Sequence, residues 1–462
     1  MRTVYQNPRP AIAIYRPEYD NAVFRQNLVV AYDPYATGPG TVSTGLLAYT
    51  FNETVKGIGG SFSFEVTPEM DNKGSTWYEK INKMDLVYIQ EAGEIRYVGV
   101  IHKKRYSSRM TDKGPVRTIS FDGDSIGEML NRFQLIFDYK LFPTIDAETA
   151  GLKLADAINE KEITIKELFT SIYTAFMDIT EQYHNTNSGV RTVLDEFISL
   201  DRCEDSNVTY LMQNSFYQQN VNTMIGMWQN YLPSPVYEIF GRYNNKVNKL
   251  EIIARECPFG DDEFLALDQY TIDPVQVIDY DLSESDDEVY TAFYSYLVGD
   301  QFDKSFYMAA DGLEGKMVLT DSDKFKMYGF RPLEATFRFY SKSNFKEDAN
   351  ILADMHKKYN EKLCKWYKNI DNMLVGTITI KTDWSGKSYP VVGCRLGWIG
   401  AQFYIQDIAH SWAYGTSPSM KITVIRGYQY AGSKTGKIRN VGQALKEFEK
   451  QQPEKTTTPR NA

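Results

Sequence analysis

Histidine, the commonest side chain at catalytic and metal sites, is scarce and scattered in this chain of 462 residues. His102, His184, His356 and His410 form no HExxH or HxH motif and no cluster with cysteine. Structural and catalytic zinc sites need such clusters. We therefore expect no metal site built on these side chains. His410 lies in a strand-like segment, where we expect a packed or hydrogen-bonded histidine.

Two glycine-rich segments resemble phosphate-binding loops but do not fit their motifs. Gly386-Lys387-Ser388 has the end of a P-loop, yet Lys381 stands where the first glycine belongs and a strand-like segment follows. The second segment, at residues 57–60, lacks the third glycine of a dinucleotide fingerprint. No GxSxG motif occurs either. The sequence therefore predicts no bound cofactor.

Carboxylates are concentrated in residues 261–288, which hold eleven Asp or Glu and no Lys or Arg. A solvated acidic face is the simplest interpretation. A pair of these carboxylates could also serve a glycosidase, or their oxygens could bind calcium, although the EF-hand spacing is absent. A third alternative is that the acidic segment meets a basic partner.

Composition excludes several classes of protein. The net charge of −9 leaves no overall basic field that could bind nucleic acid. No run of 18 apolar residues, the length needed to span a membrane, occurs in the chain. The first residues have no apolar core of a signal peptide. The four cysteines are far apart and form no CxxC, which favours a reducing compartment. Aromatic residues make up 14% of the chain, which favours strands and contact surfaces.

Strand-like alternation recurs in two parts of the chain, separated by helical periodicity. The segment from Leu374 to Tyr430 reads as four strands with short turns, and an earlier segment has a similar rhythm. Apolar residues between Ile165 and Tyr183 repeat every three or four positions, as in a helix. Asn344 and Glu347 have the spacing of a capping box, which predicts a long helix over 344–373.

These patterns predict an α+β, β-dominated fold with five parts. We expect an extended N-terminal arm at 1–26, a first antiparallel β-barrel at 27–142 and a mostly helical insert at 143–232. A second barrel follows at 233–432, with an inserted segment and the long helix before its last strands. We expect residues 433–462 to form a basic, partly disordered tail, because the chain holds seven Lys or Arg against three Glu from 434 onward.

Several motifs resemble the baseplate hub proteins of contractile phage tails and related injection particles. A hairpin ends in Pro-Phe at 258–259, a Tyr-Gly-x-Arg-Pro turn precedes the long helix, and an Arg-Gly pair closes the last strand. The order and spacing of these motifs carry the resemblance over roughly 236–430. The positions that match the family motifs are Asp281, Ser285, Asp286, Tyr328, Gly329, Arg331, Pro332, His410, Arg426 and Gly427.

The resemblance implies a structural role. Hub chains of this family form a homotrimeric ring, and each chain holds two barrels similar to the tail-tube subunit. The ring thereby adapts the sixfold tube to the threefold central spike. The implied partners are the spike protein and the tube or tube-initiator proteins, with baseplate wedge proteins or the tape measure as further candidates. The implied location is the baseplate of a virion tail or injection particle, assembled in the bacterial cytoplasm.

Two alternatives stay open at this point. The first is a tail-tip glycan hydrolase that uses the carboxylates of 261–288, and the second is a receptor-binding β protein of the tail tip. The hub interpretation predicts no enzymatic activity and no membrane insertion.

Overall fold

The computed structural model of this protein describes seventeen segments of the chain. They are residues 10–20, 23–34, 42–69, 76–91, 93–111, 114–132, 134–136, 164–170, 172–174, 196–206, 221–232, 234–297, 318–320, 322–337, 357–382, 389–398 and 400–428. The tail expected at 433–462 lies outside them.

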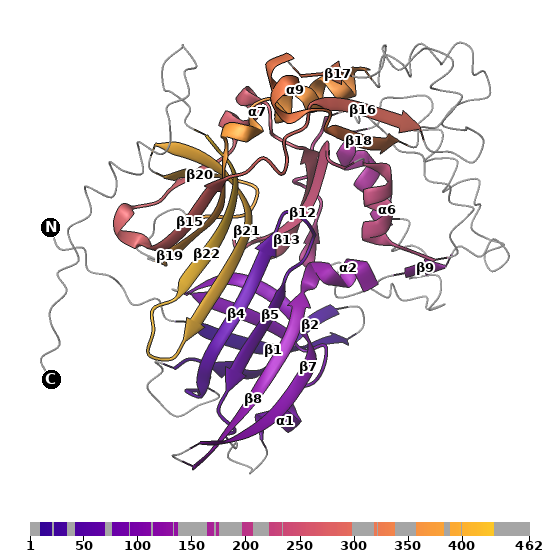
Figure 1. Cartoon of the computed structure of the whole chain (residues 1–462). Coiled ribbons are helices and arrows are strands. Elements are labelled where there is room, and N and C mark those ends of the chain that lie inside the picture. The colour runs from indigo at the N-terminus through magenta and orange to yellow at the C-terminus, as the bar shows by residue number, and fades with distance from the viewer. Residues whose placement is uncertain are drawn as a thin grey trace, which may run out of the picture.

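Fourteen strands form one large sheet that runs from one half of the molecule into the other (Figure 1). Strands β20 (Arg395–Trp398) and β14 (Gln269–Thr271) extend it beside β21. The other twelve follow one another in the order β15 (Val277–Glu284), β19 (Leu374–Lys381), β22 (Ser419–Tyr428), β21 (Ala401–Ala413), β4 (Leu46–Thr54), β5 (Ser61–Val66), β8 (Gly114–Ser125), β7 (Glu94–Thr111), β6 (Leu86–Glu91), β1 (Ala11–Asp20), β2 (Val23–Tyr32) and β3 (Val42–Ser43).

The strand order repeats along this sheet. The four strands β7-β8-β5-β4 are followed directly by β21-β22-β19-β15, and all neighbours among these eight are antiparallel. If the four strands of each group are numbered by their order in the chain, their order along the sheet is 3-4-2-1 in both groups. The two halves are therefore similar modules joined edge to edge, where β4 pairs with β21 from Ala48↔Ala413 to Thr54↔Asp407.

The core of the first half includes a hairpin from the segment expected to be an extended arm. Residues 11–20 form β1, which pairs with β2 and with β6. Ile12 and Ile14 are fully buried in a cluster with Phe64 and other aromatic residues. The expectation of an arm at 1–26 was wrong for these residues, because the alternation of Ala and Ile gives β1 one apolar face that must be covered.

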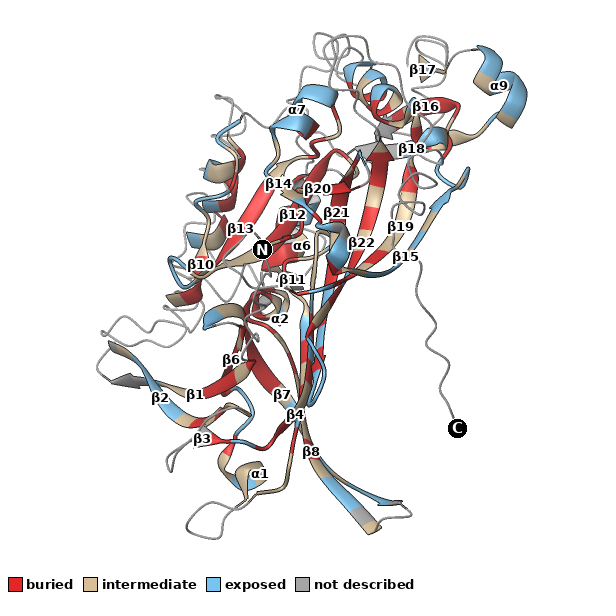
Figure 2. Ribbon diagram, turned by 90° about the vertical axis from the view of Figure 1, so that its left-hand side faces the viewer, coloured by how far each residue is buried: buried red, intermediate tan, exposed pale blue. Residues whose placement is uncertain are grey.

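The core of the second half lies between the large sheet and a smaller one (Figure 2). Strands β12 (Tyr237–Asn244) and β13 (Lys249–Glu256) form a hairpin, as the sequence predicted, and β10 (Ile198–Ser199) joins them in parallel. Phe240 and Ile253 from this hairpin pack with Ile378 and Ile422 of the large sheet.

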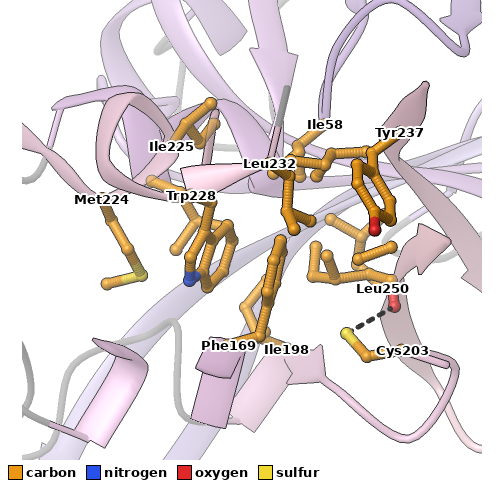
Figure 3. Packing of buried hydrophobic residues seen from close by; sticks show 14 of the residues in the cluster. Ile58, Phe169, Ile198, Cys203, Met224, Ile225, Trp228, Leu232, Tyr237 and Leu250 are labelled. Atoms are coloured by element: carbon orange, nitrogen blue, oxygen red, sulfur yellow. Dashed lines mark hydrogen bonds between the residues drawn. The ribbon is translucent and has the colours of Figure 1, made fainter. Parts of the chain in front are cut away.

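A third core contains the described part of the helical insert. Residues 165–170 and 172–174 are helical, as is α6 (Met224–Tyr231), and Phe169 stacks on Trp228 with ring centres 4.5 Å apart. Figure 3 shows this stack and the bond from Cys203 Sγ to the Ile252 carbonyl, 3.6 Å long. Most of 143–232 lies outside the described residues. Nearby elements are η1 (Ile126–Glu128), α2 (Met129–Arg132), β9 (Gln134–Ile136) and β11 (Val221–Thr223).

A small layer lies at the top of the view in Figure 1. Its three-stranded sheet has the order β17-β16-β18, and residues 357–367 form the described part of the helix expected over 344–373. Residues 286–288, which follow β15, form a bend and a turn. No described helix is long and apolar enough to cross a membrane. The remaining elements are α1 (Trp77–Lys80), α7 (Asp261–Ala266), η2 (Pro274–Gln276), β16 (Ala292–Leu297), β17 (Val318–Leu319), α9 (Ser322–Tyr328), β18 (Pro332–Phe337) and η4 (Ile370–Asn372).

Candidate functional site

The structure brings five of the ten family-motif residues together at the base of the small sheet. Arg331 forms an ion pair with Asp286 at 3.1 Å and donates to its carbonyl oxygen at 2.8 Å. The Arg331 guanidinium also lies over the Tyr328 ring, 5.5 Å from its centre. Gly329 has a φ of +72°, which ends α9 and reverses the chain into β18 at Pro332.

A buried threonine that no sequence motif indicated completes this arrangement. The Thr291 hydroxyl donates to the Gly329 carbonyl at 2.7 Å and accepts from the Arg331 backbone N–H at 2.8 Å. Thr291 is fully buried, and the next residue pairs with Pro332 in the parallel β16–β18 ladder. This cluster holds two strands in register and has no feature of a reaction centre.

Two other motif residues before this cluster have different surroundings. Asp281 is on β15, paired with Thr377 of β19. Its carbonyl oxygen comes so close to Gly376 that a Cβ there would overlap it. The Ser285 hydroxyl donates to Asp287 at 2.7 Å and caps the turn that follows β15.

Arg426 and Gly427 attach the helix of residues 357–367 to the last strand. The Arg426 guanidinium is buried, lies 3.8 Å from the Phe259 ring centre and donates to the Trp366 carbonyl at 2.8 Å. The backbone of Arg426 is left-handed, with a φ of +54°. A Cβ on Gly427 would overlap the Phe403 ring, so this position requires glycine.

His410 is a packed histidine at the junction of the two halves. Its ring stacks on Phe51, its partner across the β4–β21 ladder, with centres 4.0 Å apart. The Tyr389 hydroxyl lies 2.8 Å from Nε2. Burial, and secondarily the Arg96 guanidinium, hold the pKa of His410 well below its usual value. The imidazole is therefore neutral at pH 7 and has no exposed edge for a substrate.

Two carboxyls, buried Glu91 and half-buried Glu53, flank the same junction, and sequence reasoning missed both. Burial raises the pKa of Glu91 to about 7, although a hydrogen bond from Tyr49 opposes that rise. Burial likewise raises the pKa of Glu53 to about 7, with Arg242 and Arg96 opposing it. No local motif marks these residues, because only the joining of distant strands encloses them.

A buried ion pair connects the small β12–β13 hairpin to the large sheet. Arg255 Nε donates to Glu238 at 2.6 Å, and the Tyr404 hydroxyl donates to the other oxygen of the same carboxylate at 2.6 Å. Arg255 also reaches the Gly393 carbonyl at 2.7 Å. Burial of Glu238 raises its pKa, while Arg255 opposes that rise. The group fixes the packing of two layers, and its carboxylate is buried.

The carboxylates of residues 261–288 are all exposed. They lie in α7, in the loops on either side of β14, on β15 and in the turn after β15. A cavity of about 350 Å³ lies elsewhere, against Tyr15, Phe24 and Tyr88. Among the described residues, no group of three or more His, Cys, Asp or Glu is placed to hold a metal ion. The arrangement is that of a charged face, and it does not favour the glycosidase alternative.

The two ends of the eight repeated strands are open edges, in the sense that no further described strand pairs with them. One is the outer edge of β15, whose only described neighbour is β19. The other belongs to the second half of β7, because β6 pairs only with Glu94 to Val100. Within the described chain, residues 103–111 of β7 therefore pair with β8 alone.

These two edges have opposite charge. The β7–β8 hairpin beyond Ile101, called the arm below, extends away from the rest of the sheet with an exposed tip (Figure 2). It presents three exposed arginines, Arg105, Arg109 and Arg117, beside exposed Met110. The β15 edge presents Asp279, Asp281 and Glu284 beside Ile278, which is 49% exposed. The acidic cluster was evident from the sequence, but the arginine cluster was missed, and the sequence could not show that either lies on an open strand.

The fold is similar to that of a solved tail protein. The tail protein from Neisseria meningitidis MC58 superposes with a TM-score of 0.50 at 10% identity, covering 91% of this chain and 97% of that one. The chain therefore has the fold of that protein. The 43 kDa tail protein of prophage MuSo2 from Shewanella oneidensis gives a TM-score of 0.45 at 12% identity, over 90% of this chain and 98% of that one. No protein-family model and no curated protein matches the sequence.

Proposed function

We propose that this chain is a structural baseplate hub of a contractile tail or injection particle. Three copies form a ring that adapts a sixfold tube to a threefold central spike. The observation that carries the proposal is the repeated strand order, because two similar modules per chain give six modules in a trimer. The fold shared with a solved tail protein supports the same role.

The junction inside the chain supplies a pattern for the junctions between chains. Within the chain, the first strand of one module, β4, pairs with the second half of the third strand of the next, β21. In the module order, β15 is equivalent to β4, and the second half of β7 is equivalent to the second half of β21; both are open in the single chain. Pairing β15 of one copy with the β7 arm of the next would repeat the β4–β21 contact. Such a head-to-tail contact closes into a ring when its rotation fits.

Charge favours this pairing. Carboxylates on β15 would face guanidinium groups on the arm, and Ile278 would be covered by apolar residues such as Met110. An open edge with exposed apolar residues is prone to unspecific pairing, and a defined partner removes that hazard. The acidic segment thus has a basic partner on a second copy of the chain.

The proposed partners are the spike protein and the tube or tube-initiator proteins, in addition to the chain itself. Wedge proteins or the tape measure are further candidates. The proposed location is the baseplate, with assembly in the bacterial cytoplasm. The ring would act by shape and strand pairing, without catalysis, cofactor, nucleic-acid recognition or membrane insertion.

Charge reversal on one edge at a time tests the ring. We expect the wild-type chain to form trimers by light scattering, with threefold class averages by electron microscopy. Arg105→Glu, Arg109→Glu and Arg117→Glu together should prevent trimer formation. Adding Asp279→Lys, Asp281→Lys and Glu284→Lys to the same chain should restore it, because every contact is again complementary.

A matched control changes equally exposed carboxylates elsewhere, with Glu65→Gln, Asp205→Asn and Asp323→Asn, and should leave the trimer unchanged. A stable monomer at all concentrations, or a reversal on the arm that leaves the trimer intact, contradicts this ring. A wild-type chain that degrades peptidoglycan, and loses that activity with Asp286→Asn, would favour the hydrolase instead.

A further inference from the structure

We infer that, in the free chain, residues 434–440 of the C-terminal tail dock along the open edge of β15. The tail then covers the edge until another copy arrives. The tail and the arm of that copy would compete for the same edge. This competition rests on the proposed ring, whereas the docking of the tail does not.

The point at which the described chain ends is close to this edge. Glu284 of β15 pairs with Leu374 of β19, and Leu374 pairs with Gly427 of β22. These three residues form one row across the sheet, and the described chain ends one residue later, at Tyr428. Adjacent strands are about 4.8 Å apart, so the described chain ends about 10 Å from the β15 edge.

Acidic side chains lie near that point. Burial and, secondarily, the carboxylate of Asp261 raise the pKa of Tyr428, which places the first turn of α7 beside the end of β22. Asp261, Asp262 and Glu263 are all exposed there. The described chain therefore ends near the acids of α7 and next to the row of the sheet that contains Glu284 of β15.

The charges and lengths of the two segments match. Residues 434–440 read Lys-Thr-Gly-Lys-Ile-Arg-Asn, with three cations and no acid. The β15 edge carries three exposed carboxylates, Asp279, Asp281 and Glu284, and one exposed isoleucine, Ile278. The tail alternates at Lys437-Ile438-Arg439, which suits an added strand. Residues 429–433 span up to about 17 Å when extended, enough to cross the intervening strand β19.

Docking of the tail has a consequence for assembly. The same edge would pair with the arm of the next copy in the ring, so both cannot occupy it together. A chain whose tail is docked presents no open acidic edge. Ring closure must displace the tail, which is then free to contact another component.

Photo-crosslinking in the full-length chain tests the docking directly. Benzoylphenylalanine is placed at exposed Ile278, and in a control at Val247, which is 54% exposed on the distant β12–β13 turn. The arm reversals Arg105→Glu, Arg109→Glu and Arg117→Glu keep the chain monomeric during the reaction. We expect the probe at Ile278 to capture residues 434–440 at least tenfold more often than the control probe, by mass spectrometry of the digest.

Charge reversal in the tail should abolish this capture and move the assembly equilibrium. Lys434→Glu, Lys437→Glu and Arg439→Glu should remove the crosslink and lower the concentration of half-assembly roughly tenfold in the wild-type arm background. Equal capture by both probes, or capture that survives the tail reversal, overturns the docking. An unchanged assembly midpoint overturns the competition, and a chain that never forms trimers while the crosslink persists overturns the ring alone.

Discussion

At the residue scale, the motif positions act through backbone contacts more than through charge. The side chains of Asp286 and Arg331 are each more than one-third exposed, and ion pairs between exposed side chains contribute little to stability. Thr291, in contrast, is fully buried and satisfies two backbone groups at once. The stability of the small sheet should therefore depend on the threonine.

Replacing each member of this cluster tests that ranking. Thr291→Val keeps the shape but leaves the Gly329 carbonyl and the Arg331 N–H without their partner, so we expect a loss of about 1–3 kcal/mol in unfolding free energy. Asp286→Asn should cost less than about 1 kcal/mol. Urea denaturation followed by circular dichroism measures both, and a larger loss for Asp286→Asn would contradict the assignment.

The buried carboxyl of Glu91 should make stability depend on pH. Its pKa of about 7 in the folded state lies above the ordinary value, so the folded chain holds a proton that the unfolded chain has released. The contribution of Glu91 to the free energy of unfolding is fully present below about pH 4.3 and is lost as pH rises through 7. Glu91→Gln keeps an acceptor for Tyr49 and should gain about 1–3 kcal/mol over wild type at pH 8.

Melting temperatures from pH 5 to 8 measure this effect. His410 acts in the opposite sense, because its lowered pKa makes the folded state lose stability as pH falls below about 6.5. Glu91→Gln should therefore not change the loss of stability that His410 causes as pH falls below about 6.5. Parallel curves for variant and wild type across this range would show that the carboxyl is ionised throughout.

At the element scale, β21 connects the two halves. Its first residues pack in the core of the second half, while Trp412 near its end packs in the core of the first, stacked on Tyr49 at 5.7 Å. The same strand pairs with β4 over seven residues. The two modules should therefore unfold as one cooperative unit.

Removing the Trp412 side chain should separate them. Trp412→Ala should cost about 3–5 kcal/mol and produce two transitions in calorimetry, because this indole joins a strand of one half to the core of the other. Trp398→Ala removes an equally buried indole within the second core and should cost a similar amount with a single transition. Two transitions in both variants, or in neither, would argue against β21 as the coupling element.

At the scale of the whole molecule, the tail is expected to lie outside the three cores. Its residues 434–440 are mainly polar and charged, so docking on the β15 edge contributes only the small free energy of exposed ion pairs. Deleting residues 434–462 should shift the melting temperature by no more than a few degrees and leave the transition cooperative. Loss of cooperative melting would mean that the tail belongs to a core.

The sequence by itself determined the class of fold and the type of several elements. Period-two alternation at Leu374–Lys381 and period-3.6 repetition around Ile165 to Phe169 follow directly from the need to bury one face of an element. The absence of catalytic motifs and the clusters of acid at 261–288 and base at the tail were also evident from the sequence. The packing of His410 was expected, although its partner Phe51 was not.

Only the tertiary structure decided how the two modules meet. The pairing of β4 with β21 joins residues more than 350 positions apart, and strand register over such a separation depends on packing, which local pattern cannot specify. The burial of Glu91, the role of Thr291 and the two open edges of opposite charge likewise depend on contacts between distant segments. Edges, unlike faces, have no signature of their own in sequence, because a paired and an unpaired strand alternate in the same way.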